Sequence, residues 1–184
     1  MPSLTRTTDD NGWTPLHYAA DLNYVSIVKA LLESDADAAY IADAQGRTAH
    51  HIAALCGHHQ ILRELATWRP GCCELVDDRG CNILHLAVES NSPVAVTLIL
   101  KENLLSHLLY EKNRDGNTPL HHAAALHRPG SLGALMSSPR YARVDKEAFN
   151  RENKNVRDIV FTDDRLCSEK VRDLYVFLIT ERKL

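Results

Sequence analysis

The chain repeats itself at an interval of about 34 residues, and this constrains its fold more than any other feature. Four glycines and four histidines recur in step, separated by 34, 34 and 36 residues: Gly12, Gly46, Gly80 and Gly116, and His17, His51, His85 and His121. A fifth unit is weaker, because Asn153 replaces the glycine and Asp158 replaces the histidine. A period of this length is typical of stacked structural repeats.

Each unit reads as a turn followed by two helices. The Asp-x-x-Gly pattern at 43–46 predicts a turn in which glycine adopts a positive φ. In the first unit Thr14 is a suitable N-cap, and Pro15 follows at the first helical position. A second helix is predicted from apolar residues at helical spacing: Ile27, Val28, Leu31 and Leu32. One helix pair cannot bury its apolar face alone, so the units predict an all-α solenoid.

The stretches DDNGWTPLHYAA (9–20) and RDGNTPLHHAA (114–124) resemble the ankyrin repeat. The resemblance covers roughly residues 9–160 and implies that 1–184 is a single ankyrin-repeat domain. We expect four clear repeats and a degenerate fifth unit, or C-terminal capping helix pair, at approximately 9–42, 43–76, 77–112, 113–149 and 150–184. A helical stripe within 168–181 would belong to this cap.

Three stretches are similar to a narrower family, the plant membrane-tethered ankyrin proteins of the accelerated-cell-death type. They are GCCELVDDRGCNILHLAV (71–88), LLYEKNRDGNTPLHHAA (108–124) and RVDKEAFNRENKNVRDIV (143–160). In that family a cytosolic array precedes a hydrophobic multi-span segment. The resemblance implies the cytosolic domain of a defence or cell-death regulator, in the cytoplasm or at the cytosolic face of a membrane. No apolar run here is long enough for a bilayer, so this segment itself is not expected to insert.

Other functional classes are constrained by composition. Net charge is −3 with acids and bases mixed, so a nucleic-acid partner is not indicated. An odd number of irregularly spaced cysteines, five, indicates reduced thiols in an intracellular chain. No nucleophile elbow, P-loop or zinc-protease motif is present, so neither an enzyme nor a cofactor is expected. Two alternatives to a tethered regulator stay open: the regulatory domain of a membrane channel or transporter, and a free-standing cytosolic adaptor or inhibitor.

The repeat leaves the tips of the turns and one side of each first helix free to vary. We expect these positions to form a concave surface that binds a protein partner: Asn11, Trp13, Tyr18, Leu22, Gln45, Arg47, Ile52, Arg79, Cys81, Leu86, Glu89, Arg114, Asn117, His122 and Leu126. Tryptophan, tyrosine and arginine usually dominate interfaces. The alternative is that Trp13 covers a neighbouring turn and that the arginines are only solvated.

The histidine and cysteine pairs are not expected to bind metal. Each recurring histidine is expected to hydrogen-bond backbone in the adjacent turn, and no Cys-x-x-Cys or His-x-x-x-His spacing accompanies Cys72–Cys73. Pro129, Gly130 and Gly133 predict a short or frayed second helix in the fourth unit. Few residues precede the first turn, which predicts an uncovered first unit and self-association through it.

Overall fold

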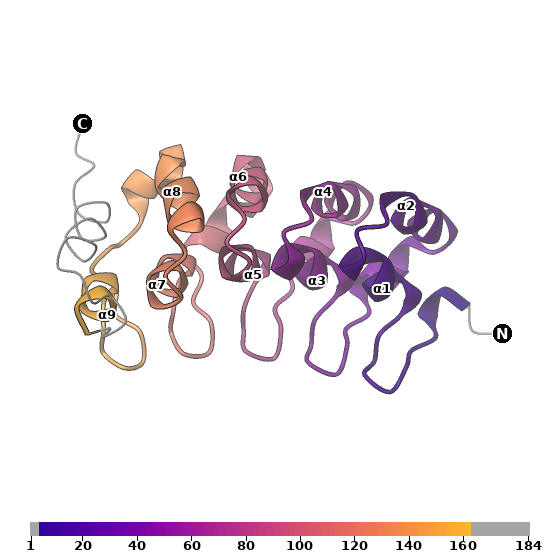
Figure 1. The fold of residues 1–184 in the computed structure, drawn as a ribbon, viewed down its shortest axis with the longest axis horizontal. Coiled ribbons are helices and arrows are strands. Elements are labelled where there is room, and N and C mark those ends of the chain that lie inside the picture. The colour runs from indigo at the N-terminus through magenta and orange to yellow at the C-terminus, as the bar shows by residue number, and fades with distance from the viewer. Residues whose placement is uncertain (1–3, 163–184) are drawn as a thin grey trace.

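The computed structural model describes residues 4–162, in which every regular element is a helix (Figure 1). The inner helices form one layer: α1 (Pro15–Asp21), α3 (Ala49–Cys56), α5 (Ile83–Glu89), α7 (Pro119–Ala125) and α9 (Val156–Thr162). The outer helices form a second: α2 (Val25–Ser34), α4 (His59–Trp68), α6 (Pro93–Lys101) and α8 (Pro129–Ser137). The predicted all-α solenoid is confirmed for this part of the chain.

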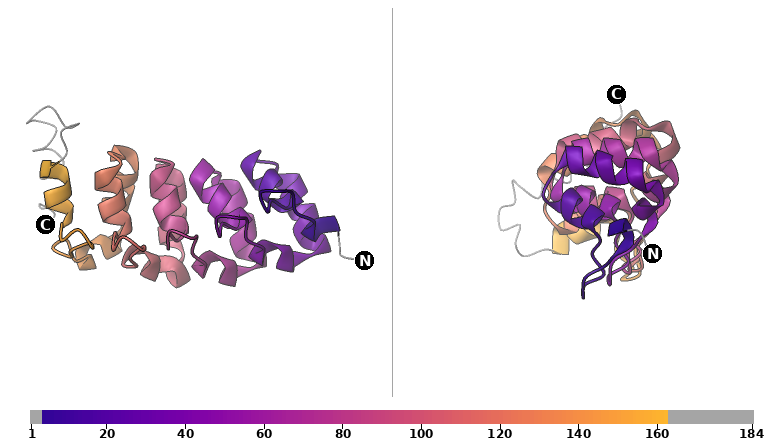
Figure 2. Two further views of the ribbon diagram at one scale, coloured as in Figure 1. Left: turned by 90° about the horizontal axis from the view of Figure 1, so that it is seen from below. Right: turned by 90° about the vertical axis from the view of Figure 1, so that its right-hand side faces the viewer.

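Short 3-10 helices complete the units: η1 (Leu4–Arg6), η2 (Ala36–Tyr40), η3 (Pro70–Glu74), η4 (Asn103–Leu109) and η5 (Pro139–Arg143). From η2 onward, each follows an outer helix and leads to the next unit. The units stack along one axis, as the end-on view in Figure 2 shows. Each inner helix contacts the next inner helix, and each outer helix contacts the next outer helix.

Small residues on the inner helices allow this close stacking. The residues two and three positions after each recurring histidine are buried in all four clear repeats: Ala19–Ala20, Ala53–Ala54, Ala87–Val88 and Ala123–Ala124. Larger apolar residues of the outer helices, such as Leu32 and Leu65, complete one continuous core. The core therefore runs along the whole array, and no unit has a core of its own.

Finger loops project from the inner layer on the side away from the outer helices (Figure 1). We use this name for residues 9–13, 43–47, 77–81, 113–117 and 150–154. Each is closed by a backbone hydrogen bond between its first and last residues, as from Asp43 N to Arg47 O at 2.8 Å. Gly46 has φ 73°, and a Cβ there would lie 2.8 Å from Asp78 Oδ1. Glycine is required there by both its backbone conformation and the close approach of the next loop.

Several expectations about individual segments change. The predicted short second helix in the fourth unit is wrong: α8 has 9 residues, as α6 does, because Pro129 occupies the first turn, where proline is tolerated. Ile27 is 46% exposed, so α2 buries a narrower stripe than predicted. Before the first unit, η1 lies against α2's C-terminal end, since Arg6 Nη2 donates to Asp35 Oδ1 at 2.7 Å. The predicted helix at 168–181 lies outside the described residues.

Candidate functional site: the concave face

One side chain organises each finger loop from its first position: Asp9, Asp43, Asp77, Asn113 or Asn150. In the second loop, Asp43 Oδ1 accepts the backbone N–H groups of Gln45 at 2.9 Å and Arg47 at 2.8 Å. The other four side chains accept the same two bonds, from the residues two and four positions later. Each loop therefore has a fixed conformation before any partner arrives, which lowers the entropic cost of binding.

Backbone hydrogen bonds also join each finger loop to the next. They run from Ala44 N to Asn11 O, Asp78 N to Gln45 O, Arg114 N to Arg79 O and Arg151 N to Asp115 O, at 2.9 to 3.0 Å. These bonds make the five loops one continuous surface. We call this surface, together with the adjoining sides of the inner helices, the concave face.

The recurring histidines tie the inner helices to backbone in or near the next finger loop. In the second repeat, His51 Nδ1 accepts the N–H of Thr48 at 3.1 Å. The other ring nitrogen, Nε2, therefore carries the proton and donates to Leu75 O at 3.0 Å. His17 and His121 make the same pair of bonds, to Arg47 O and Ala148 O. Burial lowers the pKa of all three histidines, so they are neutral at pH 7.

An aromatic cluster occupies the N-terminal end of the concave face. Trp13 and Tyr18 form an edge-to-face pair with ring centroids 5.0 Å apart. Trp13 Nε1 donates to Asp43 Oδ2 at 3.1 Å, which links the first finger loop to the second. Tyr18 Oη donates to Asp9 Oδ2 at 2.6 Å, and this bond lowers the pKa of Asp9. Trp13 thus covers a neighbouring turn, as the structural alternative held, and stays partly exposed beside the exposed Tyr18.

A hollow of about 360 Å³ lies between the second and third repeats. It is lined by Gln45, Arg47, Leu55, Asp77, Asp78, Arg79 and Glu89. Its two arginines are paired with carboxylates of the chain. Arg47 Nη2 lies 2.7 Å from Asp43 Oδ2, while Arg79 contacts Asp77 at 3.0 Å and Glu89 at 3.2 Å. Burial alone would raise the pKa of Asp43, but hydrogen bonds from Arg47 lower it overall, so the pair is ionised.

Comparison with known proteins assigns this architecture. Residues 3–72 and 38–107 match the family model of ankyrin repeats in three copies. The chain belongs to the ankyrin-repeat family. Ankyrin repeats are protein–protein interaction modules, so the coarse prediction of a binding module is confirmed.

Three curated proteins illustrate what this chain is similar to. Ankyrin repeat domain-containing protein SAT10 of Stachybotrys chartarum is 31% identical over 66% of this chain and 6% of its own length. Human NAD-capped RNA hydrolase NUDT12 is 41% identical over 38% of this chain and 15% of its own length. Human transient receptor potential cation channel subfamily A member 1 is 33% identical over 90% of this chain and 16% of its own length. The chain spans less than a fifth of each relative. Among residues 4–162, no helix is long and apolar enough to cross a bilayer.

Most of the predicted binding residues reach the surface of the ankyrin domain. Six are exposed: Asn11, Tyr18, Leu22, Gln45, Arg79 and Arg114. Six more are partly exposed: Trp13, Arg47, Glu89, Asn117, His122 and Leu126. Four of these twelve, Gln45, Arg47, Arg79 and Glu89, meet at the hollow.

Three of the predicted binding residues are inaccessible, and their assignment to the binding surface is wrong for this conformation. Ile52, Cys81 and Leu86 are 2%, 1% and 0% exposed. Ile52 and Leu86 follow the recurring histidines and belong to the core between inner helices. Cys81 ends the third finger loop, where Asn113 Nδ2 of the next loop contacts its sulfur at 3.6 Å. These side chains stabilise the stack.

Three residues that line the hollow are not among the predicted binding residues: Leu55, Asp77 and Asp78. Leu55 occupies the same register as Glu89, four residues after the recurring histidine, and Asp78 follows the organising Asp77. Register with an already selected residue was therefore the signal that pointed to Leu55. His122, by contrast, was predicted to bind a partner but is only partly exposed. It lies beside His85, with ring centroids 5.8 Å apart.

Proposed function

We propose that the concave face binds a protein partner non-catalytically, with the hollow between the second and third repeats at its centre. The observation that carries this is a preformed, rigid surface bordered by exposed Gln45, Arg79 and Arg114. The organising side chains and the backbone bonds between loops fix this surface in advance. Exposed aromatic residues at one end and arginines along the loops are the residue types that dominate interfaces.

A matched pair of triple variants tests this proposal. One combines Gln45→Ala, Arg79→Ala and Arg114→Ala, three exposed positions on the finger loops. The control combines Glu33→Ala, Lys101→Ala and Arg143→Ala, which are exposed on α2, α6 and η5. A partner identified by capture from plant tissue extract is then purified, and its Kd is measured by calorimetry. We expect at least about a tenfold loss for the loop variant alone, with unchanged melting of both variants. Equal affinity for the two variants would move the site elsewhere.

We further propose that the domain is the cytosolic part of a membrane-tethered regulator of plant defence and cell death. The support is the resemblance of 71–88, 108–124 and 143–160 to that family. The full-length transcript tests the tether: apolar segments of about 20 residues downstream of the array are expected. Disrupting the gene should then alter pathogen-induced cell death, and a normal response would count against this role.

A regulatory domain of a membrane channel or transporter is the second candidate. It is favoured by the similarity of 90% of this chain to part of a human cation channel. Both candidates place the array at a cytosolic membrane face, so electrophysiology separates them. If the full-length protein conducts ions and deletion of the array shifts its gating, the channel assignment holds. A transcript encoding only the array would instead favour the free-standing adaptor or inhibitor.

Self-association through the first unit is proposed on one observation. Ile27 on α2, the outer helix at the N-terminal end of the array, is about half exposed. Tyr24, the residue before α2, is also about half exposed. Sedimentation velocity over a hundredfold range of concentration tests it. We expect a dimer that Tyr24→Asp with Ile27→Asp abolishes; a monomer at every concentration would contradict the proposal.

A further inference from the structure

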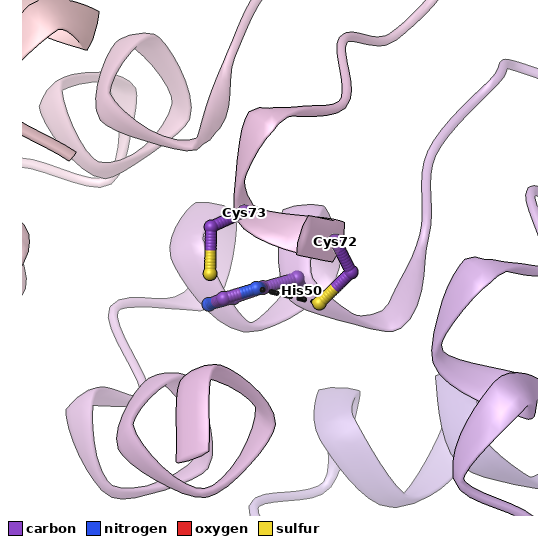
Figure 3. Close-up of side chains that lie close together, drawn as sticks. All are labelled: His50, Cys72 and Cys73. Atoms are coloured by element: carbon purple, nitrogen blue, oxygen red, sulfur yellow. Dashed lines mark hydrogen bonds between the residues drawn. The ribbon is translucent and has the colours of Figure 1, made fainter. Parts of the chain in front are cut away.

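Three side chains that can bind metal meet in the core between α3 and η3. They are His50, Cys72 and Cys73, and none is more than 1% exposed. One ligand atom from each lies within 4.8 Å of the other two, and His50 Nδ1 is 3.3 Å from Cys72 Sγ. Figure 3 shows the imidazole ring with the two sulfur atoms beside it. The helical turn of η3 directs two sequence-adjacent thiols to the same imidazole.

His50 occupies a position where the other repeats have leucine. Leu16, Leu84 and Leu120 hold this register in the first, third and fourth repeats, and each is almost fully buried. Histidine at such a position puts polar nitrogen atoms where leucine has only apolar atoms. The recurring histidines reach backbone carbonyls, whereas His50 Nδ1 lies against a cysteine sulfur, which is a weak hydrogen-bonding group. The packing role of leucine therefore does not explain this side chain.

We propose that His50, Cys72 and Cys73 bind one zinc ion. Imidazole nitrogen and cysteine sulfur are the ligands that zinc prefers. Two thiolates and a neutral imidazole also give a complex with Zn²⁺ of no net charge, as a buried site requires. From bond lengths of about 2.0 and 2.3 Å, ligand atoms in a tetrahedral site lie about 3.5–3.8 Å apart, so the cluster needs to contract by about 1 Å. The sequence-based expectation of no metal rested on the absence of Cys-x-x-Cys spacing, which this geometry does not need.

An adjoining cavity reaches one of the three proposed ligands, His50. It has a volume of about 200 Å³, and His50 forms part of its wall. Exposed residues Arg63, Thr67 and Glu102 also line it, so it opens to solvent. It has room for water, which completes tetrahedral coordination where the protein provides three ligands.

Without metal the Cys73 thiol is held protonated. A hydrogen bond with Cys72, together with burial, raises the pKa of Cys73, so the sulfur is a poor nucleophile. Zinc binds cysteine as thiolate, so its binding displaces the thiol protons to solvent and affinity increases with pH. A disulfide between the two is disfavoured, because adjacent Cα atoms lie about 3.8 Å apart and disulfides span about 4.4–6.8 Å.

The test uses the full chain with Cys56→Ser and Cys167→Ser, which removes an exposed thiol and one outside the described residues. Zinc binding to the reduced, metal-free protein is measured by competition with a chromophoric chelator, and Co²⁺ serves as a spectroscopic probe. The ligand variants are His50→Leu, which restores the leucine of the other repeats, and Cys72→Ser with Cys73→Ser. Cys81→Ser is the control, since Cys81 is buried outside the cluster.

We expect one zinc ion per chain, release of about two protons, and a thiolate-to-cobalt charge-transfer band with tetrahedral d–d bands. Affinity should fall at least about 100-fold in both ligand variants and stay unchanged in Cys81→Ser. Circular dichroism confirms that each variant is folded. Equal binding by folded His50→Leu, a cobalt spectrum without thiolate bands, or no zinc binding by the parent would each overturn the site. Binding of Cu⁺ without Zn²⁺ would overturn the zinc assignment.

Discussion

The second and third repeats are neighbours in the stack and share one backbone plan, but equivalent positions carry different chemistry. Where the second has His50 and the Thr48–His51 pair, the third has Leu84 and the Asn82–His85 pair. Arg47 is paired with the buried Asp43, whereas Arg79 is paired with the buried Asp77 and also reaches Glu89. The repeat period thus determines the backbone path of each unit. The side chain at an equivalent position can pack in one repeat and form hydrogen bonds or contact a partner in another.

His51 and His85 both place Nε2 beside a backbone carbonyl, although the N-cap residue changes from Thr48 to Asn82. His51 Nδ1 accepts the N–H of Thr48, but His85 Nδ1 lies 2.9 Å from Asn82 Oδ1, which is an acceptor. Its Nε2 lies 2.9 Å from Asn117 O, a second acceptor. Neutral His85 can therefore donate to only one of them, while its charged form could donate to both.

Of the changes considered, acidification is expected to lower the stability of these two repeats the most. Burial lowers the pKa of His51 and His85 from 6.5 to about 4. Between those values the unfolded chain binds protons that the folded chain does not, so stability is complete above pH 6.5 and falls as pH drops towards 4. Each histidine contributes a slope of about 1.4 kcal/mol per pH unit in that window.

Urea unfolding at several pH values between 7.5 and 4.5 measures this loss. His51→Gln and His85→Gln should each flatten the pH dependence by a similar amount, because the folded protein lowers the pKa of both histidines to about 4. Stability that is independent of pH across this range would show that the buried histidines do not control it.

Exchanging His50 and Leu84 between the repeats should give the next largest effect. Leu84→His removes a fully buried apolar side chain and buries a polar ring, which should cost about 3 kcal/mol. His50→Leu, measured with a chelator present, should change stability by less than about 1 kcal/mol. Denaturant midpoints of both variants test the asymmetry. Similar losses in both would mean that His50 is as firmly packed as leucine and needs no metal to explain it.

Removing the N-cap side chain should destabilise the two repeats to different extents, by a smaller difference than the exchange of His50 and Leu84. Asn82 Oδ1 accepts the N–H groups of Leu84 and His85, and its amide donates to Leu108 O at 3.2 Å. Asn82→Ala removes all of these bonds and should cost about 2 kcal/mol, against about 1 kcal/mol for Thr48→Ala. Thermal and urea unfolding of the two variants compare them directly. A larger loss at Thr48 would show that the bonds of Asn82 to η4 contribute little.

The sequence predicted the backbone pattern that recurs in each unit and failed where side-chain packing between repeats decides. Glycines at positive φ and threonines at N-cap positions follow from short patterns within a unit, and both are present. The bonds from the recurring histidines to backbone in or near the next finger loop were also predicted, because the same residue recurs at the same place in each unit. The burial of Ile52 and Leu86 depends instead on how closely inner helices stack. His50 and Cys72 are 22 residues apart, and only the fold of η3 onto α3 brings them together. A single sequence does not show which side chains distant along the chain will come into contact.

The smallest expected difference in stability is between alanine variants of the two arginines at the hollow, Arg47 and Arg79. This difference bears most directly on function. The side chain of Arg47 is 19% exposed and that of Arg79 is 51% exposed. Arg47→Ala leaves the buried Asp43 carboxylate without its cation and should cost about 1–2 kcal/mol. Arg79→Ala also removes the cation beside a buried carboxylate, that of Asp77. It should nevertheless cost less than about 1 kcal/mol, because the half-exposed guanidinium of Arg79 is screened by solvent.

Unfolding midpoints and partner affinity, measured on the same two variants, separate these roles. If Arg79→Ala weakens partner binding at unchanged stability, Arg79 belongs to the recognition surface and Arg47 to its support. If instead Arg79→Ala unfolds as readily as Arg47→Ala, the bonds of Arg79 to Asp77 and Glu89 are structural too. The centre of the concave face would then consist of fixed ion pairs, and recognition would shift to its N-terminal end, where Tyr18 and Leu22 are exposed.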